Sequence, residues 1–169
     1  IKMQNESVYY SVDRIQEALA KRRKVSFLYF KYDAAKEKVA QHGGDRYVET
    51  PVQLVYAEGY YYLVAFNEKH DGFATYRVDR MDRIRVLDEP AVRNERIATF
   101  DAQKLESRAF GMYSGSPVAA TLLVSDEAMG AVIDRFGREV KSSLAGAGRA
   151  RVHVTVMKSP VFFGWLAQF

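Results

Sequence analysis

The first half of the chain alternates apolar and polar residues in short runs that predict strands, and a helical pattern precedes them. Val12, Ile15 and Leu19 recur at helical spacing, so a helix is expected over residues 11–21, with Ser11 as its N-cap. The following runs are rich in aromatic and β-branched residues, as strands usually are. The five predicted strands cover residues 25–32, 46–56, 60–66, 73–78 and 84–88.

The residues between these runs predict how the strands connect. Residues 1–10 are interpreted as a lead-in, and residues 33–45 as a polar loop. Pro51 has no amide hydrogen for a strand ladder and indicates a bulge or an edge. Glu58 and Gly59 favour a tight hairpin turn. Five antiparallel strands with partly apolar faces would expose their edges as an open sheet, so we expect a small, strongly bent barrel.

The pattern changes after residue 89, which predicts a second unit of α+β type. Residues 90–117 are interpreted as a connector with a short helix somewhere in residues 100–110. The rest predicts the order β-α-β-β-α, with helices capped by Ser125 and Ser159. The expected strands cover residues 118–124, 139–144 and 151–156. This order suggests a ferredoxin-like unit that lacks its last strand.

The domains predicted from these patterns are an N-terminal helix and barrel, a connector and a partial C-terminal unit. They cover residues 1–89, 90–117 and 118–169. The chain starts at Ile1 and stops at Phe169 within an apolar helical pattern, so we expect it to be a fragment of a longer protein.

Composition excludes several kinds of site. The chain has no cysteine, so it cannot use disulfides, thiolate nucleophiles or cysteine-based metal sites. Its three histidines are far apart in sequence, and we expect neither a metal nor a cofactor. No signal peptide or stretch of about 20 apolar residues is present, which predicts a cytoplasmic protein without a membrane partner. The net charge of +4 permits a nucleic-acid partner without requiring one.

The catalytic motifs that were considered do not fit. In the stretch from Gly111 to Gly115 the serine is not central, as a nucleophile elbow requires. The Gly146-Ala147-Gly148 stretch lacks the lysine of a phosphate-binding loop. We therefore expect that the chain is not an enzyme.

Two neighbouring predicted strands offer a candidate binding surface. The first holds Tyr61 and Tyr62, and the second ends with Arg77 and Arg80. Arginine forks match phosphate oxygens and aromatic faces stack on bases, so the pair of strands suits an anionic or nucleotide-like ligand. The alternatives are that the tyrosines only pack in the core and that the arginines only pair with nearby aspartates.

These residues also carry a resemblance to a known family. The Tyr61-Tyr62-Leu63 triplet occupies the position of the Trp-Tyr-Leu triplet that names WYL domains, with tyrosine replacing tryptophan. Residues 25–29, 46–51 and 76–81 resemble the family's first strand, second strand and arginine signature. Residues 11–89 thus resemble a WYL domain, and residues 118–169 resemble the C-terminal extension that often follows it.

The resemblance implies an Sm-like, five-stranded small barrel that serves as a ligand-sensing module in bacterial transcription regulators. It implies a nucleic-acid or nucleotide-type ligand, and a DNA-binding helix-turn-helix domain that lies N-terminal to this chain. By motif, it assigns ligand contacts first to Tyr62, Arg77 and Arg80, then to Ser26 and Tyr29, with Tyr61 as the replaced aromatic residue.

Two functions remain open from the sequence. The first is a regulatory domain in which a ligand shifts the arrangement of a homodimer, and so the spacing of its DNA-binding domains. The second is a dimerisation or structural module without a ligand, in which the aromatic strands and the helix around Trp165 form an interface.

Overall fold

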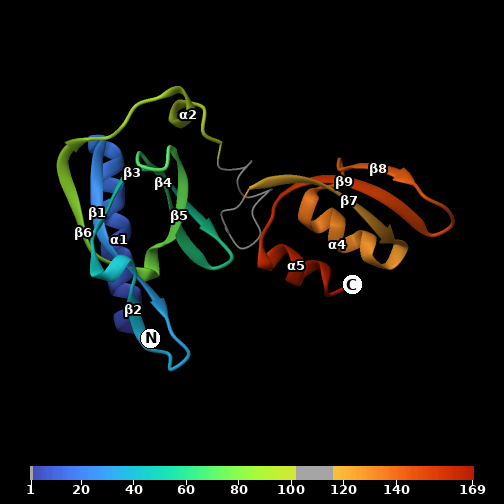
Figure 1. The fold of residues 1–169 in the computed structure, drawn as a ribbon, viewed down its shortest axis with the longest axis horizontal. Helices are drawn as coiled ribbons and strands as arrows, with labels where there is room; N and C mark the ends of the chain where they lie inside the picture. The colour runs from blue at the N-terminus through green and yellow to red at the C-terminus, as the bar shows by residue number, and fades with distance from the viewer. Residues whose placement is uncertain (1, 102–115) are drawn as a thin grey trace. The chain divides into compact units, whose positions relative to one another are not determined.

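The computed structural model describes residues 2–101 and 116–169. The chain divides into two compact units, Ile1–Ala102 and Gln103–Phe169. The first is a helix packed on a curled antiparallel sheet, and the second is a small sheet with two helices (Figure 1). The fold is thus mainly β with α+β character. None of the described helices is long and apolar enough to cross a membrane.

The first unit opens with a helix much longer than the sequence predicts. Helix α1 spans Lys2–Lys21, so residues 2–10 are helical and are not a lead-in. Ser11 is not an N-cap, because it lies inside α1 with 7% of its surface exposed. Val12, Ile15 and Ala18 are buried on the same helix face, so packing against the sheet extends the helix beyond the capping signal.

The sheet of the first unit has six strands. They are β1 (Arg23–Tyr32), β2 (Lys38–Ala40), β3 (Tyr47–Ala57), β4 (Tyr60–Asn67), β5 (Gly72–Arg77) and β6 (Met81–Pro90). All five predicted strands are present. The addition is β2, which lies within the predicted polar loop and pairs with the last residues of β1. Because β6 pairs with β1, the strand order is β6-β1-β3-β4-β5, with β2 beside the end of β1.

Two turn predictions are confirmed. The pairing of β3 with β4 shifts between Pro51 and Gln53, which is the bulge that the proline indicates. Glu58 and Gly59 join the two strands with φ angles of 53° and 81°. Positive φ at both positions is the signature of a type I′ hairpin turn.

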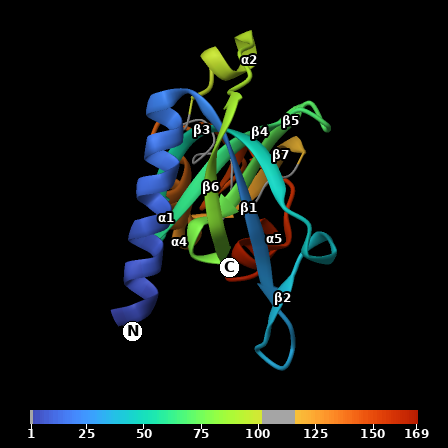
Figure 2. The ribbon, with the colours of Figure 1, turned by 90° about the vertical axis from the view of Figure 1, so that its left-hand side faces the viewer.

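The core of the first unit lies between α1 and the inner face of the sheet. It is built from alternate residues of the strands, which point to one face. Phe27, Leu63 and Val25 are fully buried, and Ile15 of α1 packs with them. Helix α1 contacts β1, β3, β6 and the short 3₁₀ helix η2 (Val78–Arg80) that joins β5 to β6. Figure 2 shows α1 running along the sheet.

A short connection leaves the first unit. It contains α2 (Glu95–Ala98), which Asn94 caps by accepting a hydrogen bond from the amide of Ile97. The helix predicted within residues 100–110 lies almost wholly outside the described residues.

The second unit has the predicted order of elements. Strand β7 (Pro117–Ser125) is followed by α4 (Asp126–Phe136), β8 (Lys141–Leu144), β9 (Arg149–Met157) and α5 (Pro160–Leu166). Ser125 and Ser159 cap the two helices, as the sequence predicts. The sheet order is β7-β9-β8, and the buried face of β9 packs against α4 and α5 through Val152, Val154 and Val156.

Candidate ligand-binding groove

Tyr62 and Arg77 lie directly opposite each other on β4 and β5. The predicted strand pairing therefore brings these two candidate residues together. Tyr62 is 5% exposed, and burial raises the pKa of its phenol. Its aromatic ring thus serves the core, which is the alternative role that the sequence leaves open.

The guanidinium of Arg77 already has partners on the protein surface. Its Nε and one terminal nitrogen donate to the two carboxylate oxygens of Asp79, at 3.0 and 2.7 Å. The same group stacks 3.6 Å above the ring of Tyr60. The hydrogen bond from Arg77 to Asp79 is the main reason that the arginine's pKa is raised. An incoming anion would have to compete with Asp79 for this side chain.

Tyr29 and Arg80 lie close to the Tyr62–Arg77 pair. The hydroxyl of Tyr29 accepts a hydrogen bond of 3.2 Å from the backbone amide of Arg77. Burial raises the pKa of Tyr29, and the charges of Arg80 and Arg77 partly offset that effect. The Nε of Arg80 is buried and has no hydrogen-bond partner within residues 2–101 and 116–169. A buried donor of this kind destabilises the folded state unless another group accepts a hydrogen bond from it.

Ser26 lies in a different place. Its hydroxyl and its carbonyl accept hydrogen bonds from the Nε and a terminal nitrogen of Arg46, at 3.1 and 3.0 Å. The structure thus separates Ser26 from the other predicted site residues and places it in a contact with Arg46.

Two adjoining hollows form a groove in the first unit. The first has a volume of about 430 Å³ and the second about 350 Å³. They share Ser7, Lys38 and Asp79. Their lining comes from the first half of α1, from the β3–β4 hairpin, from η2 and β6, and from the β1–β2 hairpin. The β1–β2 hairpin extends at the same end of the unit as the start of α1 (Figures 1 and 2). We call the two hollows together the groove.

The first hollow is rich in tyrosine. Its lining includes Tyr9, Tyr32, Tyr56, Tyr60 and Tyr61. The rings of Tyr56 and Tyr61 lie 4.9 Å apart with their planes tilted. Of the predicted residues, Tyr61 is therefore the one in this hollow. Exposed aromatic faces around a cavity suit the stacking of flat rings.

Several charged side chains line the second hollow. Its lining includes Arg80, Lys38 and Arg83, together with Asp79 and Asp82. Asp79 is paired with Arg77, and Asp82 accepts a hydrogen bond from the backbone amide of Arg83. Three cationic side chains thus line this hollow together with two carboxylates, one of which already pairs with Arg77, so this end of the groove suits an anion.

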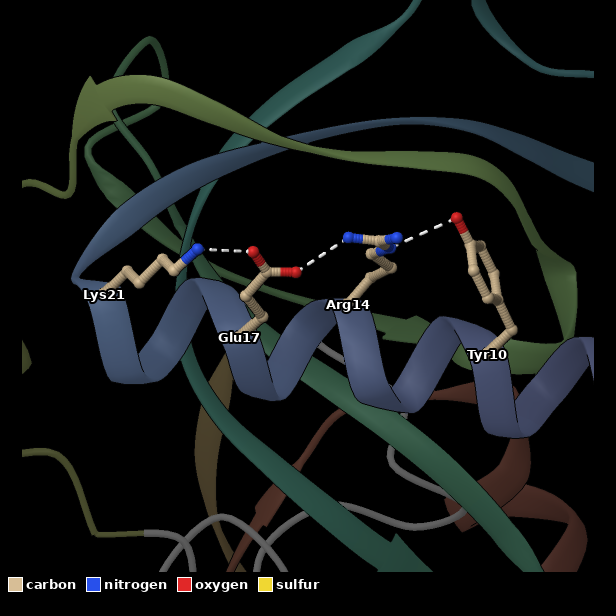
Figure 3. A network of polar contacts seen from close by, with 4 residues as sticks. All are labelled: Tyr10, Arg14, Glu17 and Lys21. Atoms are coloured by element: carbon tan, nitrogen blue, oxygen red, sulfur yellow. Dashed lines mark hydrogen bonds and ion pairs between the residues drawn. The ribbon is translucent and has the colours of Figure 1, made fainter.

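Tyr10 forms part of the wall of the second hollow and belongs to a row of contacts along α1 (Figure 3). Arg14 donates to the hydroxyl of Tyr10 at 3.1 Å and to the carboxylate of Glu17 at 2.8 Å. Lys21 donates to Glu17 at 2.7 Å, and this bond is the main reason that the pKa of Glu17 is lowered. The row restrains the phenol of Tyr10, which lines the second hollow.

Several groove residues were not predicted, because they lie in two elements that the sequence does not predict, the first half of α1 and strand β2. Tyr9 and Tyr10 fall in the stretch interpreted as a lead-in, and Lys38 falls in the stretch interpreted as a loop. The signal that could have found them is the density of tyrosines in segments with helical or strand periodicity. Within the parts of the chain that the structure describes, no cluster of three or more potential ligands could hold a metal ion.

The family comparison decides what the first unit is. The family model described as WYL domain matches residues 11–86. Residues 11–86 are a WYL domain. The match covers α1 from its middle and most of the curled sheet, including Tyr61, Arg77 and Arg80.

The comparison with curated proteins gives no match. Among solved structures, the chain is similar to proteasome accessory factor B/C (PafBC) of Arthrobacter aurescens, with 19% sequence identity and a TM-score of 0.43. That match covers 93% of this chain and 23% of PafBC, so the chain spans less than a quarter of PafBC's length.

Proposed function

We propose that this chain is a ligand-sensing regulatory domain of a bacterial DNA-binding transcription regulator. Its ligand is a nucleotide, a single-stranded nucleic acid or another anion that occupies the groove. The WYL domain at residues 11–86 supports the regulatory role. The lining of the groove supports the class of ligand, because tyrosines lie at one end and cations at the other.

The unpartnered Nε of Arg80 is the observation that carries this proposal. A phosphate or carboxylate oxygen in the second hollow could accept from it. Hydrogen bonds to charged groups are stronger than neutral ones, and forming this one would also remove the penalty of a buried, unused donor. Arg80 is thus the expected primary anion contact. Arg77 remains a second predicted contact, although its guanidinium is paired with Asp79.

The tyrosines of the first hollow give the ligand its second recognition element. Stacking on an aromatic side chain contributes about 1–3 kcal/mol per base and tolerates any base. A nucleotide could place its phosphate at Arg80 and its base against Tyr61 or Tyr56, because the two hollows share Ser7, Lys38 and Asp79.

Ligand binding would act through a shift between pre-existing arrangements. The groove is lined by α1 on one side and by the sheet on the other, so a bound ligand favours the α1 position that fits it. In a homodimer such a shift would change the spacing of DNA-binding helix-turn-helix domains encoded N-terminal to this chain. The proposal includes no catalytic step and no cofactor.

We also infer that the curled sheet is an Sm-like small barrel. Its five long strands follow the order β6-β1-β3-β4-β5, and η2 makes the tight connection from β5 to β6. An experimental structure in which β5 and β6 lie far apart, as in an open flat sheet, would contradict this inference.

The test is direct binding to the purified chain. A short fluorescein-labelled oligothymidylate and labelled thymidine monophosphate are titrated into wild type, Arg80→Gln and Tyr61→Ala. We expect Arg80→Gln to weaken both probes about tenfold or more, because a charged hydrogen bond is lost. Tyr61→Ala should weaken them about fivefold or more, and Tyr61→Phe should restore binding, because it keeps the aromatic face.

Arg138→Gln is the matched control, since it removes one exposed arginine from the second unit. Equal affinity of wild type and Arg80→Gln would remove Arg80 from the role. A wild-type chain that binds neither probe nor other small anions would reject the ligand-sensing function.

One observation favours dimerisation without a ligand as a second candidate. Helix α5 and the residues after it expose large apolar side chains, with Phe163 53% and Phe169 63% exposed. Such side chains suit an interface. Sedimentation of wild type and Phe163→Ser tests this candidate, which predicts a dimer that dissociates in the variant and is insensitive to the anionic probes.

A further inference from the structure

Three arginines lie close to Ser26 in the first unit. The guanidinium of Arg46 contacts Ser26 directly, because its Nε donates to the Ser26 hydroxyl and a terminal nitrogen donates to the Ser26 carbonyl. The same terminal nitrogen also donates to the carbonyl oxygen of Arg83. Arg46 is therefore held in a fixed position beside β6.

The strand pairing places Arg85 next to this guanidinium. Ser26 is the pairing partner of Val48 on β3 and of Arg85 on β6. Directly opposed residues of antiparallel strands point to the same face, so the Arg85 side chain leaves the sheet on the side where Arg46 contacts Ser26.

Arg83 lies at a bulge next to the Arg46 guanidinium. The pairing of β1 with β6 shifts between Ser26 and Leu28, and Arg83 has a φ of 50°. Positive φ is uncommon for a residue with a side chain, so the bulge departs from regular strand geometry. Both Arg83 and Arg85 are exposed, and we call Arg46, Arg83 and Arg85 the arginine cluster.

The charges of the cluster lack compensation. Burial lowers the pKa of Arg46 first, and the nearby charges of Arg85 and Arg83 lower it further. In the described part of the chain, no ion pair includes any of the three arginines. The nearest carboxylate along β6, that of Asp82, accepts from the backbone amide of Arg83 instead.

A purely structural role explains the position of Arg46 but not the positive charges of Arg83 and Arg85. Arg46 donates to two backbone carbonyl oxygens beside the bulge, which is a sufficient reason for its position. That role requires neither Arg83 nor Arg85 to be basic, because Arg46 contacts Arg83 through its backbone. Two exposed arginines beside a fixed third one form a surface to which a phosphate group could bind with several donors.

We propose that the arginine cluster is a phosphate-binding site, separate from the Arg80 site, for a ligand that carries more than one phosphate. Arg83 lines the cationic hollow of the groove and also belongs to the cluster, so the two sites adjoin. The proposal rests on the proposed function for the identity of the groove ligand. It deepens that function, since it selects a strand of nucleic acid over a single nucleotide.

The first experiment tests the cluster without any groove ligand. Inorganic tripolyphosphate is titrated into ¹⁵N-labelled wild type, Arg83→Gln/Arg85→Gln and the control Arg138→Gln/Arg151→Gln, which removes two exposed arginines from the second unit. We expect saturable shifts of the Arg46 Nε–H and of the Ser26 and Arg85 amides in wild type and control, and their loss in the cluster variant. Wild-type shifts that do not saturate, or that persist in the cluster variant, would overturn the proposal.

The second experiment tests the length of the ligand. Labelled oligothymidylate and thymidine monophosphate are titrated into wild type, Arg85→Gln and the control Arg151→Gln over a range of salt concentrations. Loss of one phosphate contact should reduce the slope of log affinity against log salt by about 0.7 for the oligonucleotide. Thymidine monophosphate binding should be unchanged, because one phosphate occupies the Arg80 site and Arg85 does not line that hollow.

The outcomes separate the two proposals. Oligonucleotide binding by Arg85→Gln with wild-type affinity and salt slope would overturn the cluster while leaving the groove intact. Tripolyphosphate binding at the cluster together with no binding of either nucleotide probe would support the cluster and reject the proposed nucleotide ligand of the groove.

Discussion

The hydroxyl of Tyr76 donates a hydrogen bond of 2.9 Å to the carboxylate of Glu49 inside the first unit. Asn67 donates to the same carboxylate oxygen at 2.7 Å, while the other oxygen, Oε2, is buried without a partner in the described residues. Glu49 is only 2% exposed. The WYL domain thus keeps an acid in its interior with half of its hydrogen-bonding capacity unused.

This buried acid predicts a pH dependence of stability. Burial raises the pKa of Glu49 above its ordinary value of 4.5, against the opposing effect of the bonds from Asn67 and Tyr76. The folded state then favours the protonated acid, so its contribution to stability is present below pH 4.5 and is lost as the pH rises through the folded pKa. The free energy of unfolding should fall by at most about 1.4 kcal/mol per pH unit in this range.

Urea unfolding of wild type and Glu49→Gln from pH 4 to pH 8 measures this effect. Glutamine keeps the shape and cannot ionise, so the free energy of unfolding of wild type should fall relative to that of the variant as the pH rises. Glu37→Gln, at an exposed position, should show no such divergence. A constant difference between wild type and Glu49→Gln would contradict the prediction.

The residues of the Tyr61-Tyr62-Leu63 triplet differ in burial, which predicts different effects of substituting them. Leu63 is fully buried, whereas Tyr61 lines the groove. Leu63→Ala should lower the free energy of unfolding by about 2–5 kcal/mol, because it removes buried methyl groups and leaves a cavity. Chemical denaturation followed by circular dichroism measures the loss, and Tyr56→Ala, at a side chain that is 62% exposed, should lose much less.

Asp79 predicts a gain in anion binding. Asp79→Asn removes the carboxylate that engages Arg77 and also removes a negative charge from the groove. Affinity for a labelled oligothymidylate at low salt should rise by about 1 kcal/mol, or roughly fivefold, and the gain should shrink as salt screens the charges. Asp33→Asn makes the same charge change outside the groove lining and serves as the control. Weaker binding by Asp79→Asn would show that the Arg77–Asp79 pair positions the site.

Ser159 predicts the stability of the second unit. Its buried hydroxyl accepts a hydrogen bond of 3.2 Å from the amide of Phe162 at the start of α5. Ser159→Ala should cost about 0.5–2 kcal/mol, because the cap is lost and a donor is left unsatisfied. Trp165 is the only tryptophan of the chain and packs against Phe136, so its fluorescence reports the second unit alone. Ser143→Ala, at an exposed position, is the matched control.

The sequence was sufficient where a local signal and packing agree. Pro51 marked a bulge because a missing amide hydrogen acts locally, and Glu58-Gly59 marked the hairpin because its φ angles are a property of the turn. Ser125 and Ser159 marked helix starts in the second unit for the same reason. The sequence also predicts β4 and β5 as neighbouring strands, and their pairing sets Tyr62 opposite Arg77.

The sequence was insufficient where tertiary contacts decide. Ser11 resembles an N-cap, yet packing of Val8 and Val12 against the sheet carries the helix back to Lys2. Strand β2 is three residues long and forms by pairing with β1. No local sequence pattern predicts this pairing. These two elements form much of the groove, so the candidate site could be predicted only in part.

The joint between α1 and β1 has a mechanical consequence. Only Arg22, with a φ of 53°, separates the helix from the strand, and its backbone is tied by hydrogen bonds to Leu19 and Ala91. The helix is therefore anchored at this end, while its first half borders the groove. A force applied to the N-terminus of α1 is expected to change the width of the groove, and a ligand that fills the groove is expected to fix the angle of the helix.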